Sequence, residues 1–489
     1  MKIATCIIAL MFVPYSKASI LMPLSEAIHL AQQHSLDAQM ARFSFLGNYW
    51  TYRSYRAELL PAASLSGSLL NYDRSVTSVR NYEDGRINYV ENNSLTNSLT
   101  LSVSQNIMAT GGTVSLQSYL YRLDQFNYDM RTYNSQPLRL VYDQPLRTFN
   151  SLKWRNKSEP VAYERAKRQY LESMQSIAVT VVNLYFSVLS AQSEYKQSVA
   201  TAEERSRLYE QTRRRFSLGT VTKSELLQLE LSAINARVAV KRHRLTLDDA
   251  RFQFFTYLQA SHWDNVELLA PDNVPDIVLN EDEVMQRAVE ASTHPLTQKL
   301  SLIESQRNLS QAKAQRGIQV SLHSELGLRN TANHFSDAYR HLQDNEIVGL
   351  SVSVPIFDWG VSKGRVRIAK ANLDVTRTQI EQDDIEYRQE VKKLVMQFNL
   401  QYEQCRDAAR AEEIADERYT LTVQRFETGS INVTELNTAQ QEKESARSQY
   451  ISQLRTYWSN YYNIQRRTLW NYIKNNEITT DFDKIIHKN

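Results

Sequence analysis

The sequence predicts a duplicated, mainly α-helical fold in which long antiparallel helical hairpins are combined with groups of β-strands. The first observation is the scarcity of helix breakers, because the 489 residues include only 12 glycines and 10 prolines. Gly219 is the only glycine between Pro160 and Pro271, and Gly429 is the only glycine after Gly364. Two stretches of more than 100 residues can therefore be helical almost throughout. This excludes β-sandwiches, doubly wound α/β enzymes and most loop-rich catalytic folds.

The second observation is an internal repeat. Residues 215–226 (RFSLGTVTKSEL) match residues 425–436 (RFETGSINVTEL) at an offset of 210, and a shorter match at an offset of 257 relates residues 26–65 to 283–322. The chain is therefore predicted to be a tandem duplication of about 20–258 and 279–470, and each half reads helix, strands, long helix, turn, long helix. We divide it into a signal peptide (1–18), a first repeat (19–258), a connection (259–295), a second repeat (296–470) and a polar tail (471–489).

The N-terminus has the pattern of an export signal. Lys2 precedes an apolar run over residues 3–14, and Ser16 and Ala18 are small residues where a signal peptidase cleaves, so we expect cleavage after Ala18. A buried N-terminal element is the alternative. No later run of 18 apolar residues is apparent, so we expect no transmembrane helix and a periplasmic, secreted or β-barrel protein.

The long helices carry a regular apolar stripe. In the second half it consists of Tyr387, Val391, Leu394, Phe398, Tyr402, Cys405 and Ala409, and in the first half only Gln192 departs from the equivalent pattern. Such a stripe packs against another helix, and about 55 residues from 160 to 215 would extend about 80 Å. Gly219 and Gly429 are placed to end these helices, with Thr222 or Ser224, and Asn432 or Thr434, capping the returning ones.

The third observation is a period of two between the helices. Residues 98–104, 319–328 and 347–354 alternate apolar and small polar side chains, as in soluble strands and in strands that cross a membrane. The export signal favours the membrane. Residues 75–93 and 330–344 are predicted to be long polar loops. Residues 113–142 of the first half predict an additional hairpin. Two placements are open: it joins the other strands in a barrel wall, or it lies outside that wall.

Together with the duplication and the tip motif, the segment Pro355-Ile356-Phe357-Asp358-Trp359-Gly360 resembles the TolC family of outer-membrane efflux channels. The resemblance covers about residues 20–470. It implies a homotrimer in which each chain adds two pairs of strands to one shared transmembrane β-barrel. The helical hairpins would form an α-barrel tunnel in the periplasm of a Gram-negative-type bacterium, with an equatorial region around 259–295 and the C-terminus. A periplasmic adaptor and an inner-membrane pump would dock at the helical tips.

The resemblance also suggests site residues. Aligned on Gly429, Glu435 takes the place of an acidic residue that narrows the periplasmic aperture, whereas Thr438 and Ile431 replace a second acid and a base. Glu435 alternatively serves only as a first-turn acid of its helix. The expected adaptor-docking residues are those of the two turns: Leu218, Gly219, Thr220, Thr428, Gly429 and Ser430. Turn geometry alone would also explain the two glycines.

The predicted function is therefore an outer-membrane channel-tunnel of a tripartite export system, passing small molecules or drugs. The alternatives are an exit duct for one-step protein secretion and a periplasmic coiled-coil scaffold without a pore. No metalloprotease, phosphate-loop or nucleophile-elbow motif is present, so we expect no enzyme, cofactor or metal. The net charge of +3 gives no support to a nucleic-acid partner. The expected partners are two further copies, the adaptor, the pump and outer-membrane lipid.

Overall fold

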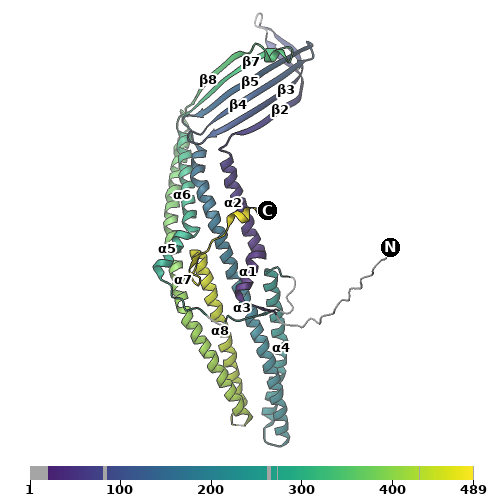
Figure 1. Cartoon of the computed structure of the whole chain (residues 1–489), viewed down its shortest axis with the longest axis vertical. Coiled ribbons are helices and arrows are strands. Elements are labelled where there is room, and N and C mark those ends of the chain that lie inside the picture. Colours follow the sequence, from purple (N-terminus) through teal and green to yellow (C-terminus); the bar gives the residue numbers. More distant parts are fainter. Residues whose placement is uncertain (1–19, 81–84, 261–265, 272–273, 429, 488–489) are drawn as a thin grey trace, which may run out of the picture. The chain divides into compact units, whose positions relative to one another are not determined.

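A computed structural model describes residues 20–80, 85–260, 266–271, 274–428 and 430–487 (Figure 1). The predicted signal peptide, residues 1–18, lies outside the described residues. The chain forms two compact units. Unit 1 comprises residues 1–45, 167–293 and 386–489, and unit 2 comprises residues 46–166 and 294–385. Each unit takes segments from both predicted repeats. The helices over residues 36–57, 151–217 and 361–427 contribute residues to both units.

The helices follow the predicted order. They are α1 (Leu24–His34), α2 (Leu36–Ala57), α3 (Ser151–Ser217), α4 (Lys223–Tyr257), α5 (Glu281–Ala291), α6 (His294–Arg316), α7 (Val361–Glu427), α8 (Val433–Thr468) and the short α9 (Phe482–His487). Helices α3 and α7 have 67 residues each, or about 100 Å at 1.5 Å per residue. Helix α3 begins nine residues earlier than expected, since Pro160 lies within its first turns rather than before them.

The predicted apolar stripes form the main core of unit 1. Ile177, Val181, Val391 and Phe398 are all buried there. Gln192, which departs from the pattern, is buried for a different reason: its side-chain amide donates to the carbonyl oxygen of Leu268 at 3.2 Å. The sequence pattern therefore marks a polar contact between α3 and the strand that contains Leu268.

One 18-residue window of α3 is apolar enough to cross a membrane by length and composition, contrary to our expectation that the chain holds no such segment. Within unit 1, however, 61% of this window is buried. Its hydrophobicity is therefore accounted for by packing in the helical core.

Short strands complete unit 1. Strand β1 (Ile20–Met22) pairs in parallel with β6 (Val266–Leu268), and β9 (Trp470–Asn471) pairs with β10 (Asn476–Glu477). The Tyr185 hydroxyl lies 2.8 Å from the carbonyl oxygen of Met22 and 2.6 Å from that of Leu269, so it joins the β1 and β6 segments to α3. The ring of Phe482 lies 4.9 Å from that of Phe45, so the C-terminal tail also packs on the helices.

Unit 2 contains a six-stranded antiparallel sheet in the order β2-β3-β4-β5-β7-β8. The strands are β2 (Ala62–Arg80), β3 (Ile87–Ile107), β4 (Gly112–Gln125), β5 (Met130–Pro145), β7 (Gln319–Ala332) and β8 (Gln343–Ser353). The hairpin predicted at residues 113–142 is β4–β5, and it lies in the middle of the sheet. The expectation of two strand pairs per chain is therefore wrong, because the sheet has three.

The predicted loop over residues 75–93 is also largely strand, since β2 extends to Arg80 and β3 begins at Ile87. Polar side chains pair across these strands: the guanidinium of Arg74 lies 2.8 Å from the carboxylate of Glu91, and the amide of Asn92 donates to Asp73 at 2.7 Å. Such cross-strand pairs stabilise a sheet without any apolar face, which is why alternation of hydrophobic residues does not reveal it. Between β7 and β8 the loop is shorter than predicted and contains a 3-10 turn at Asp337–Tyr339.

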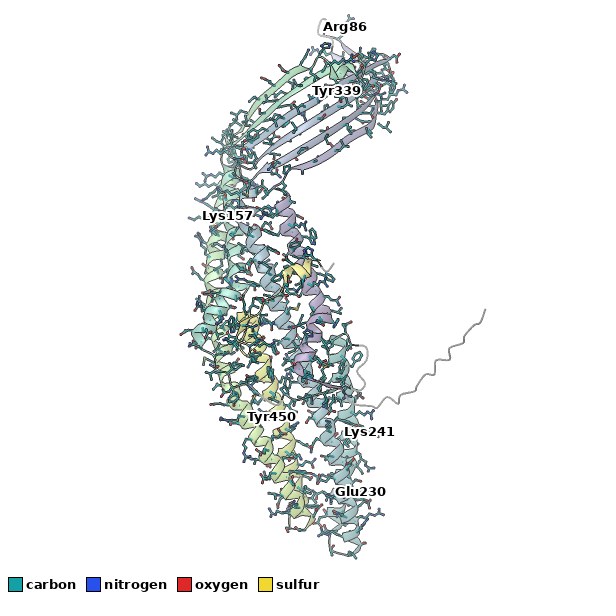
Figure 2. All side chains as sticks on the ribbon, in the orientation of Figure 1. Arg86, Lys157, Glu230, Lys241, Tyr339 and Tyr450 are labelled. Atoms are coloured by element: carbon teal, nitrogen blue, oxygen red, sulfur yellow. The ribbon has the colours of Figure 1, made fainter. Side chains whose placement is uncertain are left out.

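The two faces of the sheet differ in polarity. One face carries exposed apolar side chains from all six strands: Leu65, Leu101, Leu116, Leu140, Leu326 and Leu350. On the other face Ser115, Val141 and Glu325 are directly opposite one another on β4, β5 and β7, and all three are buried. In Figure 2, Arg86 and Tyr339 mark one end of the sheet, and Lys157 lies on the helices that continue from the other.

Candidate docking and aperture site at the helical tips

The first helical tip is a glycine-terminated turn between α3 and α4. Gly219 has a φ of +72°, and its backbone N–H donates to the carbonyl oxygen of Phe216 at 2.9 Å. The next amide, that of Thr220, donates to the carbonyl oxygen of Arg215 at 3.1 Å. This pair of bonds is the Schellman motif, which satisfies the last carbonyl groups of a helix. The side chain of Leu218 is left 77% exposed at the apex.

The second tip, between α7 and α8, repeats this arrangement at an offset of 210 residues. The backbone N–H of Ser430 donates to the carbonyl oxygen of Arg425 at 2.9 Å, as Thr220 does to Arg215. The Thr428 hydroxyl donates to the same carbonyl at 2.9 Å and lies 3.0 Å from the Ser430 hydroxyl. Gly429 itself lies outside the described residues. The repeat in the sequence is therefore also a repeat of hydrogen bonds.

The returning helices begin where the sequence predicts. Thr222 caps α4, and together with Glu225 it forms a reciprocal capping box. The backbone N–H of Thr222 donates to the Glu225 carboxylate at 2.8 Å, which, together with the Thr222 hydroxyl, holds the pKa of Glu225 below its usual value. Asn432 caps α8 through the backbone N–H of Glu435 at 3.0 Å. Both predicted caps, Thr222 and Asn432, are confirmed.

Glu225 and Glu435 are equivalent in sequence, but their carboxylates are used differently. Glu225 returns a hydrogen bond to its cap. In the part of the chain that the structure describes, the exposed carboxylate of Glu435 takes part in no hydrogen bond or ion pair. Since the carboxylate is not needed to cap α8, it is available for an ion or a partner, as an aperture residue requires.

Glu435 lies in a groove of about 660 Å³ along α7 and α8. The groove also contains Thr438 and Ile431, the two positions that depart from the family pattern, and Arg418 and Arg425 contribute positive charge. The same groove therefore contains the predicted aperture residue, Glu435, and the two positions at which this sequence differs from the family pattern. Because the groove holds bases as well as acids, its field on one chain is mixed rather than strongly negative.

Above the tips, the two hairpins meet in a small separate core. It comprises Leu208, Leu229, Tyr419, Val433, Leu436 and Ala439, which come from all four long helices of unit 1. Phe216 and Phe426 of the repeated motif differ here, since Phe426 packs against this core and Phe216 is partly exposed beside Lys223. The tips are therefore held by this core in addition to their own turns.

A buried arginine that sequence inspection missed crosses this contact. Arg205 of α3 is 3% exposed, and its guanidinium donates to the side-chain oxygen of Gln440 on α8. Burial lowers the pKa of Arg205, and its Nη1 atom has no hydrogen-bond partner among the described residues. The amide nitrogen of Gln440 donates to Thr201 at 2.8 Å and to Glu444 at 2.9 Å. Arg205 falls in a charged stretch of α3, so only tertiary packing distinguishes it from exposed neighbours.

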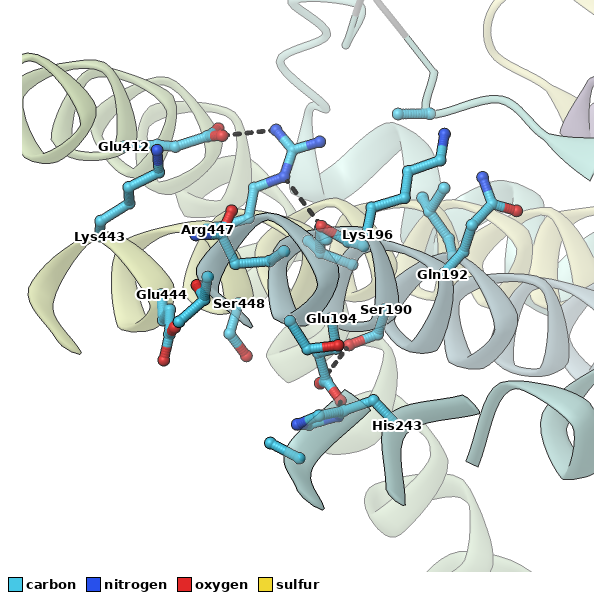
Figure 3. Close-up of a pocket in the computed structure, with 18 of the residues that line it drawn as sticks. Ser190, Gln192, Glu194, Lys196, His243, Glu412, Lys443, Glu444, Arg447 and Ser448 are labelled. Carbon is cyan, nitrogen blue, oxygen red and sulfur yellow. Dashed lines mark hydrogen bonds and ion pairs between the residues drawn. The ribbon is translucent and has the colours of Figure 1, made fainter. Parts of the chain in front are cut away.

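A hollow of about 690 Å³ borders the main core, since Leu189, Leu268 and Ile451 of that core line it together with polar side chains (Figure 3). Its wall includes Arg447, which contacts Glu412 and Ser193, and His243, whose Nδ1 lies 3.3 Å from the Glu194 carboxylate. Charges of both signs therefore neutralise one another around it. Among the described residues no group of three histidine, cysteine or acidic side chains could hold a metal ion.

Comparisons with known proteins agree with this architecture. Residues 291–465 match the family model for outer membrane efflux proteins. The CmeC outer membrane channel of Campylobacter jejuni superimposes with a TM-score of 0.66 at 14% identity, over 100% of this chain and 97% of that one. The outer-membrane channel OprN superimposes with a TM-score of 0.64 at 16% identity, over 91% and 89% of the two chains.

CusC, described as forming a transmembrane channel, superimposes with a TM-score of 0.64 at 14% identity and covers 91% of both chains. A search of the curated proteins finds no match. At these identities the solved structures establish the fold, while the family model identifies the second half of the sequence. The resemblance noted from the tip motif and duplication is confirmed in two respects: residues 291–465 match the outer membrane efflux protein family, and the chain has the fold of these outer-membrane channels.

Proposed function

We propose that the chain is the outer-membrane channel-tunnel component of a tripartite export system, working with a periplasmic adaptor and an inner-membrane pump. The observation that carries the proposal is the polarity of the sheet. Leucines from every strand are exposed on one face, whereas the opposite face presents mainly serine, glutamine and charged side chains, with Val141 buried among them. A strand that faces lipid on one side and a water-filled lumen on the other has this alternation. A periplasmic scaffold without a pore would not require a sheet with an exposed apolar face.

The open edges of the sheet support a shared barrel. Strands β2 and β8 lie at the two edges and pair on one side only within the chain. In a membrane every strand edge must be paired, so a sheet of this kind requires closure with further copies. Pairing of β8 in one copy with β2 in the next closes such a wall. The number of copies, three, is carried over from the family resemblance.

The helices of unit 1 offer matching surfaces. Helix α4 carries an exposed apolar stripe at steps of three, four and seven residues: Leu227, Leu231, Ile234, Val238, Leu245 and Phe252. Helix α7 carries a second stripe at Met396, Leu400, Ile414 and Leu421. Within one chain α3 and α8 contact each other, because Arg455 on α8 donates to Asn183 on α3 at 2.9 Å. Because the stripes on α4 and α7 differ, pairing of α4 in one copy with α7 in the next would be a head-to-tail contact, the kind from which a closed ring of copies is built.

The strand-to-helix junction supports contact with outer-membrane lipid. Ile356, Phe357 and Trp359 are all strongly exposed there, with Trp359 89% exposed. The rings of Phe357 and Trp359 pack edge to face with centroids 4.6 Å apart. The Asp358 carboxylate accepts the backbone N–H groups of Gly360 and Ser362, which holds this turn at the start of α7. Exposed aromatic side chains next to a sheet with an apolar face are typical of a membrane–water interface.

The test is the native mass of the full-length protein extracted in detergent from purified outer membranes. We expect a mass near three chains. Leu245→Glu places a charge in the α4 stripe and should abolish the trimer, whereas Thr246→Glu, one residue outside the stripe and also exposed, should leave it intact. Recovery as a soluble periplasmic monomer or dimer would eliminate the channel and favour the scaffold. Equal masses for the two variants would remove the stripe from the interface.

A further inference from the structure

We propose that Arg122 and Arg131, held together by Asp124 on the apolar face of the sheet, bind the phosphate group of an anionic lipid in the outer leaflet of the membrane. The proposal rests on the proposed function, because it takes this face to be the surface in contact with lipid. It goes beyond that function by assigning one class of ligand, a phosphate-bearing lipid, to named side chains of the wall.

The apolar face has a height that places these residues at a membrane boundary. On β3 its apolar side chains run from Ile107, near the start of α3, to Leu99, which is paired with Leu120 of β4. These two levels are eight residues apart in the sequence. The separation is about 27 Å along the strand, or about 21 Å across a membrane at a strand tilt of about 40°. Because the lipid-facing band of a barrel is about 25 Å tall, the side chains beyond Leu99 lie at its outer boundary.

Aromatic side chains gather at the same level. The rings of Tyr133 on β5 and Phe335 of the β7–β8 loop pack edge to face with centroids 5.9 Å apart, and Phe335 also contacts Tyr339. Figure 2 labels Tyr339 at this end of the sheet. On the β2 side, the rings of Tyr72 and Phe126 have centroids 6.3 Å apart. All of these side chains except Tyr133 are exposed. A girdle of this kind is typical of the interface between membrane and water.

The charged cluster at this level is built on one buried carboxylate. Asp124 of β4 is 6% exposed. The guanidinium of Arg122 donates to its two oxygens at 2.7 and 3.0 Å, and Nε of Arg131 on β5 donates at 2.6 Å. The Arg122 guanidinium also lies 5.9 Å from the ring centroid of Tyr133. Two guanidinium groups that share one carboxylate leave a net positive charge in a fixed position.

Both guanidinium groups remain accessible. The side chains of Arg122 and Arg131 are 38% and 56% exposed, against 9% for that of Asp124. In the part of the chain that the structure describes, Nη1 of Arg122 and both Nη atoms of Arg131 take no part in holding Asp124. Strands β4 and β5 are central in the sheet, so closure of the wall through β2 and β8 leaves the cluster uncovered. By contrast, Arg74 on the same face is matched by the carboxylate of Glu91.

The surroundings favour a phosphate that is carried by a lipid. Guanidinium groups bind phosphate oxygens in a planar, two-pronged geometry, and such charge-assisted bonds are stronger beside a region of low dielectric constant. Leu120 lies two residues from Arg122 on the same face, beside Leu99 of β3. A phosphate bound at the cluster would therefore place its acyl chains over these leucines. A free phosphate ion would use the charge of the cluster and none of this apolar surface.

The experiment uses the full-length trimer extracted in detergent from outer membranes. Native mass spectrometry measures the binding of dioleoyl phosphatidic acid and of dioleoyl phosphatidylcholine, which share their acyl chains and differ in net charge. We expect phosphatidic acid to bind at least about tenfold more tightly. Arg122→Gln/Arg131→Gln should remove this preference. Equal affinities of the original protein for the two lipids would overturn the proposal.

Two variants separate lipid binding from a purely structural ion pair. Asp124→Asn keeps both arginines and removes the negative charge, so the preference for phosphatidic acid should be retained or increase. Loss of the preference in Asp124→Asn would make the cluster an internal contact of the sheet and overturn the proposal. Arg329→Gln is the matched control, because Arg329 is exposed on the opposite face of β7. It should leave binding unchanged, and a loss equal to that of the double variant would contradict a site on the apolar face.

If the double variant yields no trimer, Arg131→Gln alone provides the comparison, since Arg122 still holds Asp124 through two hydrogen bonds. This variant should weaken phosphatidic acid binding and leave phosphatidylcholine binding unchanged, and an unchanged preference would count against the proposal.

Inorganic phosphate tests the source of the phosphate group. It should not displace phosphatidic acid at comparable concentrations, because it has no acyl chains to lie over the leucines. Displacement would assign the cluster to a free anion and overturn the assignment to lipid. A trimer without a preference for phosphatidic acid refutes this proposal alone, whereas recovery of the protein as a soluble monomer would refute the proposed function and this proposal with it.

Discussion

Replacing Gly219 separates the two roles proposed for the first tip, turn geometry and docking. The residue has a φ of +72°, and a Cβ atom added to it would meet no atom within 4 Å. The Gly219→Ala change therefore introduces backbone strain and no steric overlap. A left-handed conformation costs an L-residue about 1–2 kcal/mol. This corresponds to a roughly five- to thirtyfold larger population of the opened turn.

The assay is hydrogen exchange at the Thr220 amide, whose bond to the Arg215 carbonyl depends on the left-handed residue before it. Exchange should accelerate about five- to thirtyfold in Gly219→Ala and remain near the original rate in Gly219→Asn, since asparagine tolerates this conformation. Unchanged exchange in the alanine variant would refute the geometric explanation of this glycine. Export measured in parallel tests the docking role. If Gly219→Asn keeps the turn and the trimer but loses export, the apex of the tip is a contact surface for a partner.

The other predictions concern the tips and the core above them. Glu435→Gln should reduce the preference for cations in single-channel recordings, because three copies would bring three such carboxylates together around the axis; an unchanged reversal potential would exclude Glu435 from the aperture. Tryptophan at Leu218 or Thr428 should abolish complementation of export without reducing trimer yield, and a lower trimer yield would make these positions structural. Gln440→Leu should lower the free energy of unfolding by about 3 kcal/mol or more, since it leaves the buried Arg205 without its acceptor. Arg205→Met should leave this free energy nearly unchanged. Similar losses for the two variants would contradict this account of the buried pair.

The elements that were predicted correctly from sequence depend on short-range physical rules. The helix ends at Gly219, the caps at Thr222 and Asn432, and the buried stripes of α3 and α7 all follow from residues within one or two turns of each other. Repetition of the tip motif at a fixed offset predicted two equivalent turns, and the structure shows the same bond in both, from Thr220 to Arg215 and from Ser430 to Arg425. These features would be expected in an isolated hairpin.

The elements that were missed depend on partners far away in the chain. Arg205 is buried only because Gln440, 235 residues later, packs against it. Residues 75–80 are strand because Arg74 and its neighbours pair with polar residues across the hairpin, where no apolar alternation exists to reveal it. Alternation within residues 113–142 predicted strands, but it contains no information on which strands lie beside them.

The sequence by itself therefore determined the duplicated architecture, the helical hairpins, the turns at their tips and the family, because helix breakers, caps and hydrophobic periods act locally. The tertiary structure alone decided that β4–β5 lies between β3 and β7, that the sheet has six strands, and that a small core with a buried arginine joins the two hairpins. Strand neighbours and buried polar contacts are settled by pairing between distant segments, since every backbone N–H and C=O group of a strand must find its partner on another strand.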